Sequence, residues 1–588
     1  MFKIFKKMSQ TEKWLVLVSV LFILLQVSLE LKIPDYMSEI TRLLQEDGTK
    51  TSDILIPGAK MILMSLTSFA ASVVVGYFAA KIAAGLTRRL RGEIFDRVTD
   101  YSAKEIQHFS VPSLVTRTTN DLTQIQMLVA MGLQVVIKGP ITAVWAITKI
   151  ANKNWEWTTA TAVAVGVLLV LITVIMTWVR PKFTLVQSLT DNLNSVTREN
   201  LTGIRVIRAY NAEAYQNQKF ETANDDLTQV NLFTGRMMSF ISPTMTLVSS
   251  GLTLSVYWLG STLIQNAAAA DKLTLFSDMV VFTSYAMQVV MGFMLMTMIF
   301  FILPRALVSA KRINEVLDLK PSIEYVAEAT EDLKETGTVS FEGVSFAYPE
   351  ASEDVLHHIS FSAKKGETVA FIGSTGSGKS TILKLIPRLY DITSGTIRVD
   401  GQDIKEFQQE QLNNIIGYIP QKAVLFSGNI RSNMDLGTSN DSPLDDQKIY
   451  QALEIAQAAD FVKAEPGQLD AEVAQGGTNF SGGQKQRLAI GRVIARKPEI
   501  LIFDDSFSAL DYQTDKKLRG ILKEEVPETT KLIVAQRIST IMDADQIIVL
   551  NEGRIAGKGT HRELLASNQI YQEIAYSQLS KEELENEE

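Results

Sequence analysis

The sequence contains Gly373-Ser374-Thr375-Gly376-Ser377-Gly378-Lys379-Ser380, a glycine-rich run from which the fold of the second half of the chain can be predicted. Apolar, strand-like residues 368–372 precede this run, and the helical stretch 381–385 follows it. In such a loop the glycines let backbone N–H groups turn inward around a phosphate, at the positive end of the helix. Strand, loop, lysine, serine and helix together predict a nucleoside triphosphate site, which a chance glycine-rich turn does not explain.

Two residues of this loop have specific predicted roles toward the triphosphate. Lys379 would bridge the β- and γ-phosphates, and the Ser380 hydroxyl would ligate Mg²⁺. A second Mg²⁺ anchor is expected at Asp504, which ends the buried apolar strand 500–503. Many strands end in aspartate, so this carboxylate becomes a specific signal only when paired with the phosphate loop. ATP and Mg²⁺ are therefore the predicted ligands.

The surrounding residues predict the fold class of the second half. From Val339 onward, short β-type runs such as 339–341 and 368–372 alternate with helical stretches. This alternation is typical of an α/β domain with a largely parallel sheet. We predict a nucleotide-binding domain over 339–580, preceded by a charged linker at 319–338 and followed by an acidic tail at 581–588.

The first half of the chain, 1–318, has the composition of a membrane domain. A helix that spans a bilayer needs about 20 apolar residues. Six segments meet or approach this requirement: 14–33, 57–85, 124–149, 157–179, 239–265 and 275–303. The third segment is the weakest because Lys138, Gly139 and Pro140 interrupt it. The sequence therefore predicts a multi-pass protein with six transmembrane helices.

Basic residues predict the orientation of these six segments. They cluster after the second, fourth and sixth segments and are few in the other connections, 34–56, 150–156 and 266–274. Because cytoplasmic connections carry the excess of Lys and Arg, both termini are expected in the cytosol. The inward connections, 86–123 and 180–238, show helical periodicity, so we expect membrane helices that continue into the cytosol and turn there through short helices.

Overall composition excludes several classes of function. The net charge is −8, and no basic face dominates, which argues against a nucleic-acid partner. The chain has no cysteine, so disulfides, thiolate metal sites and cysteine nucleophiles are excluded.

A second motif carries a family resemblance. Phe480-Ser481-Gly482-Gly483-Gln484 lies ahead of the second carboxylate strand and resembles the signature motif of ABC transporters, with phenylalanine in place of leucine. The resemblance implies that Ser481, Gly482, Gly483 and Gln484 face ATP held by an opposing domain, so that two such domains enclose two nucleotides. It covers essentially the whole chain and is specific to exporters with six helices ahead of the nucleotide domain.

Further residues match the family pattern in order. Tyr348 matches the aromatic residue that stacks on adenine, although a packed strand tyrosine is the alternative. Gln421 matches the glutamine that links Mg²⁺ and water to the membrane-domain contact, and 508–511 matches the loop at the dimer interface. Residues 117–121 and 199–206 resemble the cytosolic turns of exporters. The nucleotide-binding set implied is Tyr348, Gly373, Ser374, Thr375, Gly376, Ser377, Gly378, Lys379, Ser380, Thr381, Gln421 and Asp504, of which Ser380, Gln421 and Asp504 would hold the metal.

Two departures from the family pattern lie at the catalytic positions. Asp505 stands where efficient ATP-hydrolysing members have glutamate, and the shorter side chain withdraws the carboxylate by about an ångström. Gln536 stands where the family has a switch histidine, and glutamine cannot become cationic. Together they indicate a degenerate site, with a functional homodimer of modestly tuned sites as the alternative.

The resemblance then implies a division of labour between two different chains. The pattern resembles the degenerate-site subunit of heterodimeric bacterial multidrug exporters, the group that includes EfrCD-like and BmrCD-like pairs. The implied partner is a second, non-identical half-transporter that holds the glutamate and the histidine. The alternatives are a lipid or peptide exporter, and a nucleotide-gated channel or regulator.

The membrane half offers weaker signals about cargo. The sixth segment holds Met287, Met291, Met294, Met296 and Met298. Methionine adapts its shape, so a cavity lined with it suits varied apolar or amphipathic molecules, although packing or lipid contact explains any single methionine at least as well. The cargo expected for such an exporter is hydrophobic or cationic compounds. Glu30 and Lys138 are costly in hydrocarbon and are candidates for a cargo pathway, unless Glu30 reaches water at the outer end.

Overall fold

The computed structural model describes residues 1–44, 50–151, 154–268, 271–326, 335–349, 351–437 and 443–579, without the side chains of 184, 300 and 301. The predicted tail 581–588 and residues 327–334 of the predicted linker lie outside these ranges. Two compact units are present, Met1–Thr99 with Val111–Leu319, and Asp100–Ser110 with Lys320–Glu588. Residues 100–110, predicted as part of the membrane half, thus group with the second unit.

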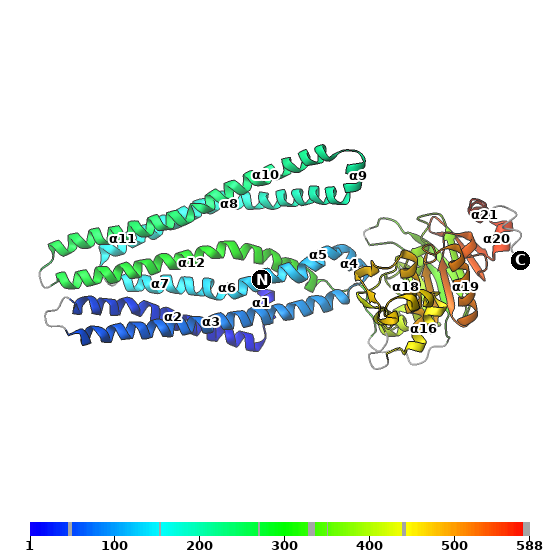
Figure 1. Cartoon of the computed structure of the whole chain (residues 1–588), viewed down its shortest axis with the longest axis horizontal. Coiled ribbons are helices and arrows are strands. Elements are labelled where there is room, and N and C mark those ends of the chain that lie inside the picture. The colour runs from blue at the N-terminus through cyan, green and yellow to red at the C-terminus, as the bar shows by residue number, and fades with distance from the viewer. Residues whose placement is uncertain are drawn as a thin grey trace. The chain divides into compact units, whose positions relative to one another are not determined.

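The first unit is entirely helical in its described part. Six helical runs in it are long and apolar enough to span a membrane, which confirms the six predicted segments. The first two and the last are single helices, whereas the third and fifth are compound (Figure 1). The helices are α1 (Phe2–Lys6), α2 (Gln10–Leu43), α3 (Thr51–Thr99), α5 (Val111–Thr116), α6 (Leu122–Gly132), α7 (Lys138–Ala151), α8 (Trp155–Thr202), α9 (Ile204–Ala209), α10 (Glu213–Ser239), α11 (Ile241–Asn266) and α12 (Lys272–Asp318).

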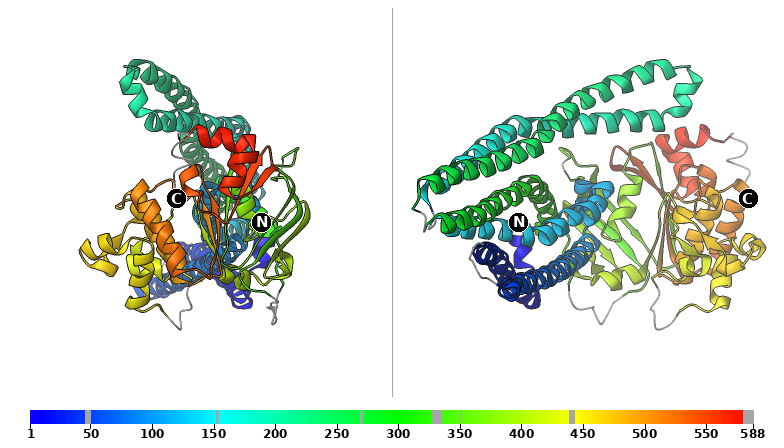
Figure 2. Two further views of the ribbon diagram at one scale, coloured as in Figure 1. Left: turned by 90° about the vertical axis from the view of Figure 1, so that its right-hand side faces the viewer. Right: turned by 60° about the vertical axis from the view of Figure 1, so that its left-hand side comes forward.

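Several of these helices are longer than a bilayer is thick. The 49 residues of α3 extend for about 74 Å at 1.5 Å per residue, against a hydrocarbon core of about 30 Å. The 48-residue α8 and α10 run side by side and are joined through the short α9, as Figures 1 and 2 show. The inward connections are therefore continuations of membrane helices with a short helix at the turn.

The third membrane run stays helical through the residues that weakened its prediction. A π-helical turn at Leu133–Ile137 leads directly into α7, which begins at Lys138. Gly139 packs closely against α12, where an added Cβ would lie 3.2 Å from the carbonyl oxygen of Gly292. Pro140 lies three residues after this π-helical turn, where the i→i−4 hydrogen-bond pattern is already irregular. Glycine and proline here permit close helix packing and do not end the span.

The second unit contains a six-stranded sheet with the order β12-β11-β3-β10-β9-β6. Its five strands from β11 to β6 are parallel, and β12 is antiparallel. β9 and β10 are buried at every position, as expected for central strands of a parallel sheet, and their segments 500–503 and 532–534 are entirely apolar. The strands are β3 (Thr368–Gly373), β6 (Ile416–Ile419), β9 (Ile500–Asp504), β10 (Thr530–Val534), β11 (Gln546–Asn551) and β12 (Arg554–Gly559).

This six-stranded sheet confirms the predicted largely parallel sheet, and a second, antiparallel sheet that the sequence did not predict accompanies it. The antiparallel sheet has the order β2-β1-β4-β5, and the predicted strand at 339–341 belongs to it as the start of β1 (Val339–Phe346). Its strand β2 (Leu356–Ala363) alternates between buried and less buried positions, as expected when one face meets the core. The other strands are β4 (Ser394–Val399) and β5 (Gln402–Asp403).

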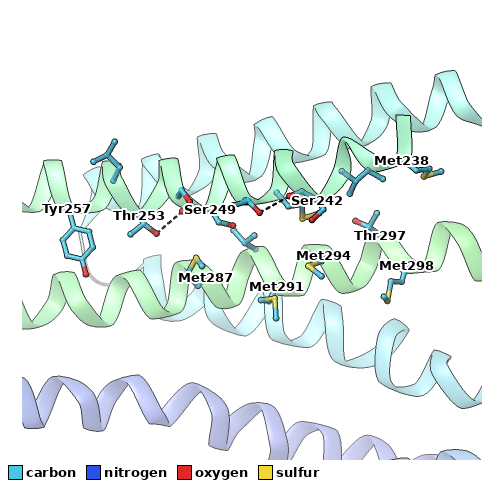
Figure 3. A pocket seen from close by; sticks show the side chains of 16 residues that line it. Met238, Ser242, Ser249, Thr253, Tyr257, Met287, Met291, Met294, Thr297 and Met298 are labelled. Atoms are coloured by element: carbon cyan, nitrogen blue, oxygen red, sulfur yellow. Dashed lines mark hydrogen bonds between the residues drawn. The ribbon is translucent and has the colours of Figure 1, made fainter. Parts of the chain in front are cut away.

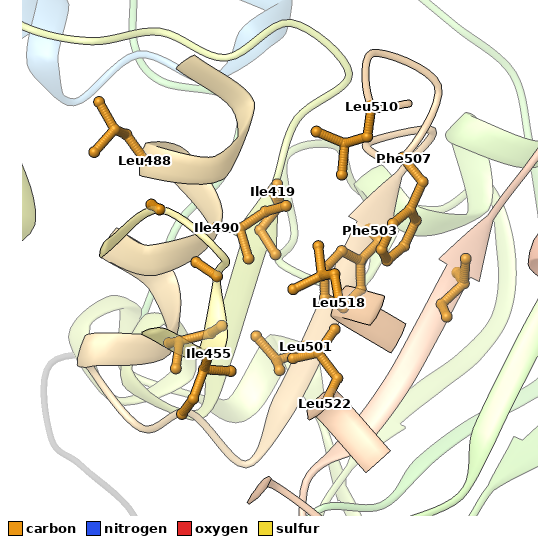
Figure 4. Close-up of a cluster of buried hydrophobic side chains, with 14 of the residues drawn as sticks. Ile419, Ile455, Leu488, Ile490, Leu501, Phe503, Phe507, Leu510, Leu518 and Leu522 are labelled. Atoms are coloured by element: carbon orange, nitrogen blue, oxygen red, sulfur yellow. The ribbon is translucent and has the colours of Figure 1, made fainter. Parts of the chain in front are cut away.

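Two hydrophobic cores hold the catalytic elements of the second unit. One lies between the parallel sheet and two helices, α18 (Gly482–Ala495) and α19 (Tyr512–Glu525), and contains Ile419, Phe503 and Leu518 (Figure 4). The other lies between the two sheets and packs Phe371 against Phe361. Because β6, β9 and β10 share the first core, their carboxyl ends are held at one edge, where the candidate site forms.

Candidate functional site

The phosphate loop connects β3 to α13 (Lys379–Leu385). Gly378 caps this helix with a left-handed backbone at φ 94°, and a Cβ there would lie 2.6 Å from Leu356 Cδ2. The Lys379 ammonium donates to the carbonyl oxygens of Gly373 at 2.9 Å and Ser374 at 2.7 Å, so it lies inside the loop. Burial lowers its pKa, which nearby Asp505 partly offsets. The loop thus places a cation where β- and γ-phosphates would lie.

The geometry of Asp504 fits a divalent cation. Its side chain is 3 % exposed at the end of β9. Tyr418 donates to Asp504 Oδ2 at 2.9 Å, whereas Asp504 Oδ1 is buried and has no hydrogen-bond partner among the described residues. A buried carboxylate oxygen without a donor is costly unless a cation or water satisfies it. Asp504 and the Ser380 hydroxyl are therefore suited to Mg²⁺, the hard cation that prefers oxygen ligands.

Asp505 is held by two glutamines through a single oxygen. Gln421 Nε2 donates to Asp505 Oδ2 at 3.0 Å, and Gln536 Nε2 donates to the same atom at 2.7 Å. The backbone of Asp505 is left-handed, with φ 52°, a conformation that aspartate tolerates better than most residues. Burial raises the pKa of the Asp505 carboxyl, and Asp504 adds to the increase, while the two glutamines oppose it.

Tyr348 lies beside the phosphate-loop helix. Its hydroxyl and the Thr381 hydroxyl are 3.0 Å apart, and its ring meets Phe346 and Tyr390 edge to face. Both interpretations of Tyr348, adenine stacking and packing within the domain, are compatible with this position, because the ring packs against two aromatic neighbours and lies next to the phosphate loop. Tyr390 in turn accepts a hydrogen bond from Gln107 of α4 (Ala103–Phe109) at 3.2 Å.

The signature residues form the N-terminus of α18. Ser481 caps this helix by accepting from Gln484 N at 3.3 Å, and Gln484 Oε1 accepts from Ser481 N at 2.9 Å. The reciprocal bonds leave the amides of Gly482 and Gly483 at the open end of the helix. Such an end carries partial positive charge and favours an anion. A Cβ on Gly483 would lie 3.3 Å from the carbonyl oxygen of Ala509, so the signature and the 508–511 loop are neighbours.

The structure separates the predicted site residues into two groups. Lys379, Asp504, Asp505, Gln421 and Gln536 converge through the contacts given above. In the described part of the chain, the side-chain oxygens of Ser481 and Gln484 each accept from the other residue's backbone N–H and not from this group. The backbone of Gly376 has φ 85°, and the buried Ser377 hydroxyl has no hydrogen-bond partner among the residues that the structure describes. Thr375 is exposed at the tip of the loop.

Two residues of the site escaped sequence reasoning. Tyr418, the donor to Asp504, lies on β6, three residues before Gln421. Its signal was an aromatic residue on a strand that leads into the glutamine loop. Gln107 lies 283 residues from its partner Tyr390, and no local pattern links the two.

A cavity of about 980 Å³ lies between α11 and α12 in the first unit (Figure 3). One wall is a row of methionines at helical spacing on α12, and the facing wall on α11 carries serine and threonine hydroxyls. Four of the five predicted methionines line this cavity, whereas Met296 does not. The lining includes Met238, Ser242, Met245, Ser249, Thr253, Tyr257, Met287, Met291, Met294 and Met298.

Two ion pairs join charged residues of the first and third spans. Lys138 Nζ lies 3.0 Å from Glu30 Oε1, and Gln26 and Ser68 donate to the same oxygen at 2.9 and 3.3 Å. A second pair joins Lys149 to Asp35 at 2.9 Å. Glu30 is thus tied to α3 and α7, and neither Glu30 nor Lys138 lines the cavity between α11 and α12.

Comparison with known proteins identifies the family. Residues 16–293 match the ABC transporter transmembrane region, and residues 356–508 match the ABC transporter family. An uncharacterized ABC transporter ATP-binding protein of Mycobacterium bovis is 37 % identical, covering 92 % of this chain and 93 % of its own. A bacterial Atm1-family ABC exporter with ATP bound has the same fold, with a TM-score of 0.80, 24 % identity and coverage of 95 and 98 %.

Two further relatives have names that specify different cargo. A multidrug resistance ABC transporter ATP-binding and permease protein of Lactococcus lactis is 30 % identical, covering 91 % of this chain and 88 % of its own. An ATP-dependent lipid A-core flippase of Pseudomonas fluorescens is 29 % identical, with 87 and 83 % covered.

The chain belongs to the ABC transporters. It is a half-transporter with the fold of an ABC exporter, in which one membrane domain precedes one nucleotide-binding domain in a multi-pass protein of the plasma membrane. Family membership implies ATP binding, for which Mg²⁺ is normally required.

Proposed function

We propose that this chain is one subunit of a heterodimeric exporter, and that its own ATP site is degenerate while its signature motif completes the partner's catalytic site. The observation that carries the proposal is the state of Asp505, whose Oδ2 accepts from Gln421 and Gln536. Gln536 is a neutral amide that can hydrogen-bond but cannot carry a proton to or from a reacting group. Both groups expected to act on an attacking water are thus altered in one site.

The remaining residues support nucleotide binding at this site. Lys379, the loop amides and Ser377 would hold the phosphates, and Tyr348 and Thr381 would contact the adenosine end. Ser380, Asp504 and Gln421 would hold Mg²⁺, which when bound neutralises the charge on the β- and γ-phosphate oxygens. Binding groups that are intact beside altered catalytic groups favour a site that retains ATP and hydrolyses it slowly.

The signature group supports a different role toward the partner. Ser481, Gly482, Gly483 and Gln484 form an intact helix N-terminus with open amides. An intact anion site next to an altered carboxylate is expected if these residues act on the partner's nucleotide. The partner would be a non-identical half-transporter with glutamate and histidine at the two altered positions. A homodimer of weak sites is the alternative.

The proposed cargo is a hydrophobic or cationic amphipathic compound. Support comes from the cavity between α11 and α12, where methionines face hydroxyl groups. Flexible, polarizable methionine side chains adapt to varied apolar shapes, and hydroxyls accept or donate hydrogen bonds without a fixed charge. The relatives named above include both a multidrug transporter and a lipid A-core flippase, so lipid is the second candidate cargo. A peptide exporter or a nucleotide-gated channel would share the same ATP site.

ATP hydrolysis by the purified chain alone tests the proposal. We expect very low activity, because neither composite site of a homodimer would contain a glutamate base. Robust turnover that vanadate inhibits would contradict the heterodimer and favour a homodimer. In the assembled pair, transport coupled to hydrolysis would support an exporter, whereas passive flux gated by ATP binding would support a channel.

A further inference from the structure

Gln578, next to the end of the described chain, forms two hydrogen bonds with the loop that carries Gln536. Gln578 Nε2 donates to the carbonyl oxygen of Gln536 at 2.8 Å, and Gln578 Oε1 accepts from the backbone N–H of Ile538 at 2.9 Å. One carboxamide thus pairs with a C=O and an N–H on either side of Arg537. The side chain therefore forms hydrogen bonds with two backbone groups where the loop after β10 enters the short 3₁₀ turn Ile538–Thr540, as a neighbouring backbone strand would.

Gln578 is itself fixed by the helix that precedes it. The helix α21 (Gln569–Tyr576) buries Tyr571 and Ala575 completely, and the Tyr571 hydroxyl lies 2.6 Å from His561 Nδ1. The backbone amides of Gln578 and Leu579 both donate to the carbonyl oxygen of Ala575 at 3.0 Å. A surface glutamine in solvent samples many rotamers, whereas here both ends of the amide and its backbone are bonded.

The same loop reaches the catalytic position from its other side. The Gln536 backbone is held by Gln578, and the Gln536 side chain donates to Asp505 Oδ2 at 2.7 Å. A continuous series of hydrogen bonds therefore runs from α21 through Gln578 and Gln536 to Asp505. The backbone position of Gln536 determines where its side-chain amide lies. The hydrogen bond from Gln578 to that backbone therefore also fixes the position of the amide relative to Asp505.

We propose that Gln578 is a positioning residue for the nucleotide site: it fixes the loop between β10 and the turn Ile538–Thr540 so that Gln536 reaches Asp505 and the γ-phosphate side of bound ATP. The proposal rests on the roles given to Gln536 and Asp505 under the proposed function, and it does not depend on the identity of the partner. It extends the ATP site to a residue 42 positions after Gln536, in the turn that follows α21 and outside the ATP-binding motifs.

The test measures ATP binding at this chain's own site in the assembled transporter. Photolabelling with 8-azido-ATP, followed by separation of the subunits, reports how much nucleotide this chain binds. For Gln578→Ala we expect half-saturation to require about 3- to 10-fold more nucleotide, the effect of losing one or two net hydrogen bonds. Gln572→Ala is the matched control, because Gln572 lies on α21 and donates to the carbonyl oxygen of Leu565 at 2.7 Å, away from the loop.

A double-mutant cycle separates positioning from a general loss of folding. If Gln578 acts through Gln536, then Gln578→Ala adds nothing in a Gln536→Ala background. If it only supports the fold, its effect persists in that background and Gln572→Ala shares it. The proposal would be overturned if the Gln578→Ala variant were labelled as strongly as wild type. It would also be overturned if the effects of Gln578→Ala and Gln536→Ala on labelling were fully additive. Failure of the heterodimer proposal would appear instead as ATPase activity of the chain alone, with this cycle unchanged.

Discussion

Gln536 Nε2 lies 2.7 Å from Asp505 Oδ2, and this oxygen also accepts from Gln421 Nε2 at 3.0 Å. Three parts of the second unit, the ends of β6, β9 and β10, thus meet at one carboxylate oxygen. Both donors are neutral amides, so neither can take up the proton that hydrolysis releases. The arrangement holds the carboxylate firmly, and no imidazole is among its hydrogen-bond donors in the described part of the chain.

Restoring the two family residues is expected to restore hydrolysis non-additively. Asp505→Glu alone should raise ATP hydrolysis at this site only in part, because Gln536 still replaces histidine. Combined with Gln536→His, the gain should exceed the sum of the two single gains, since both groups act on one transition state. ATPase assays of the assembled transporter, with Asp505→Asn as baseline, measure the three variants. Strict additivity would contradict the shared site.

The signature and the phosphate loop of this chain are expected to act in different composite sites. Ser481→Ala should lower ATP turnover of the assembled pair by about 10²–10³-fold, the usual loss when a donor to developing charge is removed. Lys379→Ala should weaken nucleotide binding to this chain with a smaller loss of turnover. ATPase and transport assays on both variants compare them. A larger ATPase loss for Lys379→Ala would assign catalysis to this chain's own site.

Asp400 is expected to make the stability of the nucleotide-binding domain depend on pH. It is fully buried after β4, accepts from Thr338 N at 2.9 Å, and has a pKa raised to about 6 by burial and by nearby Glu499. A carboxyl whose folded-state pKa is raised stabilises the fold when protonated. This contribution is complete below the unfolded pKa of about 3.9 and is lost as pH rises through about 6.

Asp400→Asn tests this dependence. The asparagine oxygen can still accept from Thr338 N, so the hydrogen bond survives while the charge is removed. We expect the variant to unfold at a higher temperature than wild type at about pH 7.5, with the difference shrinking toward about pH 5. Thermal unfolding of the purified full chain measures it, and Glu410→Gln, an exposed residue of α14 (Gln409–Ile415), is the control. A pH-independent difference would show that Asp400 does not titrate in this range.

The Glu30–Lys138 pair is expected to stabilise the packing of α2 against α7. The two side chains are about three-quarters buried and lie 3.0 Å apart. Glu30→Gln should lower membrane-domain stability by about 1–3 kcal/mol, because it leaves the Lys138 charge without its partner. The exchange Glu30→Lys with Lys138→Glu should recover most of the loss. Thermal unfolding in detergent compares them, and a double variant no better than either single one would show that the pair is not coupled.

The cavity between α11 and α12 is expected to bind cargo. Met291 and Met294 line it, whereas Met296 lies on the same helix and does not. Met291→Ala combined with Met294→Ala should reduce the apparent affinity for hydrophobic cations about 3- to 10-fold, because contact with the adaptable side chains is lost. Cargo-stimulated ATPase activity measures it, and Met296→Ala should leave cargo affinity unchanged. Equal effects of all these variants would indicate packing alone.

Local sequence patterns were sufficient to predict several features of the fold and of the candidate site. Six apolar segments, the phosphate loop, the carboxylate at the end of β9 and the signature motif are each contained in a short run of residues, so periodicity and spacing are enough to find them. The same holds for the altered residues Asp505 and Gln536. Their chemical deficits, a shorter carboxylate and a neutral amide, follow from residue type before any folding is considered.

Contacts between residues far apart in the sequence could not be predicted from local patterns and are seen only in the tertiary structure. The antiparallel sheet depends on pairing of β1 with β2 and β4, which short strands do not encode individually. Tyr418 donates to Asp504, which is 86 positions away. Lys138 pairs with Glu30 across 108 positions, and Gln578 donates to the Gln536 backbone across 42. Each depends on which helices and strands pack side by side, because burial of apolar faces sets those neighbours and the polar contacts form afterward.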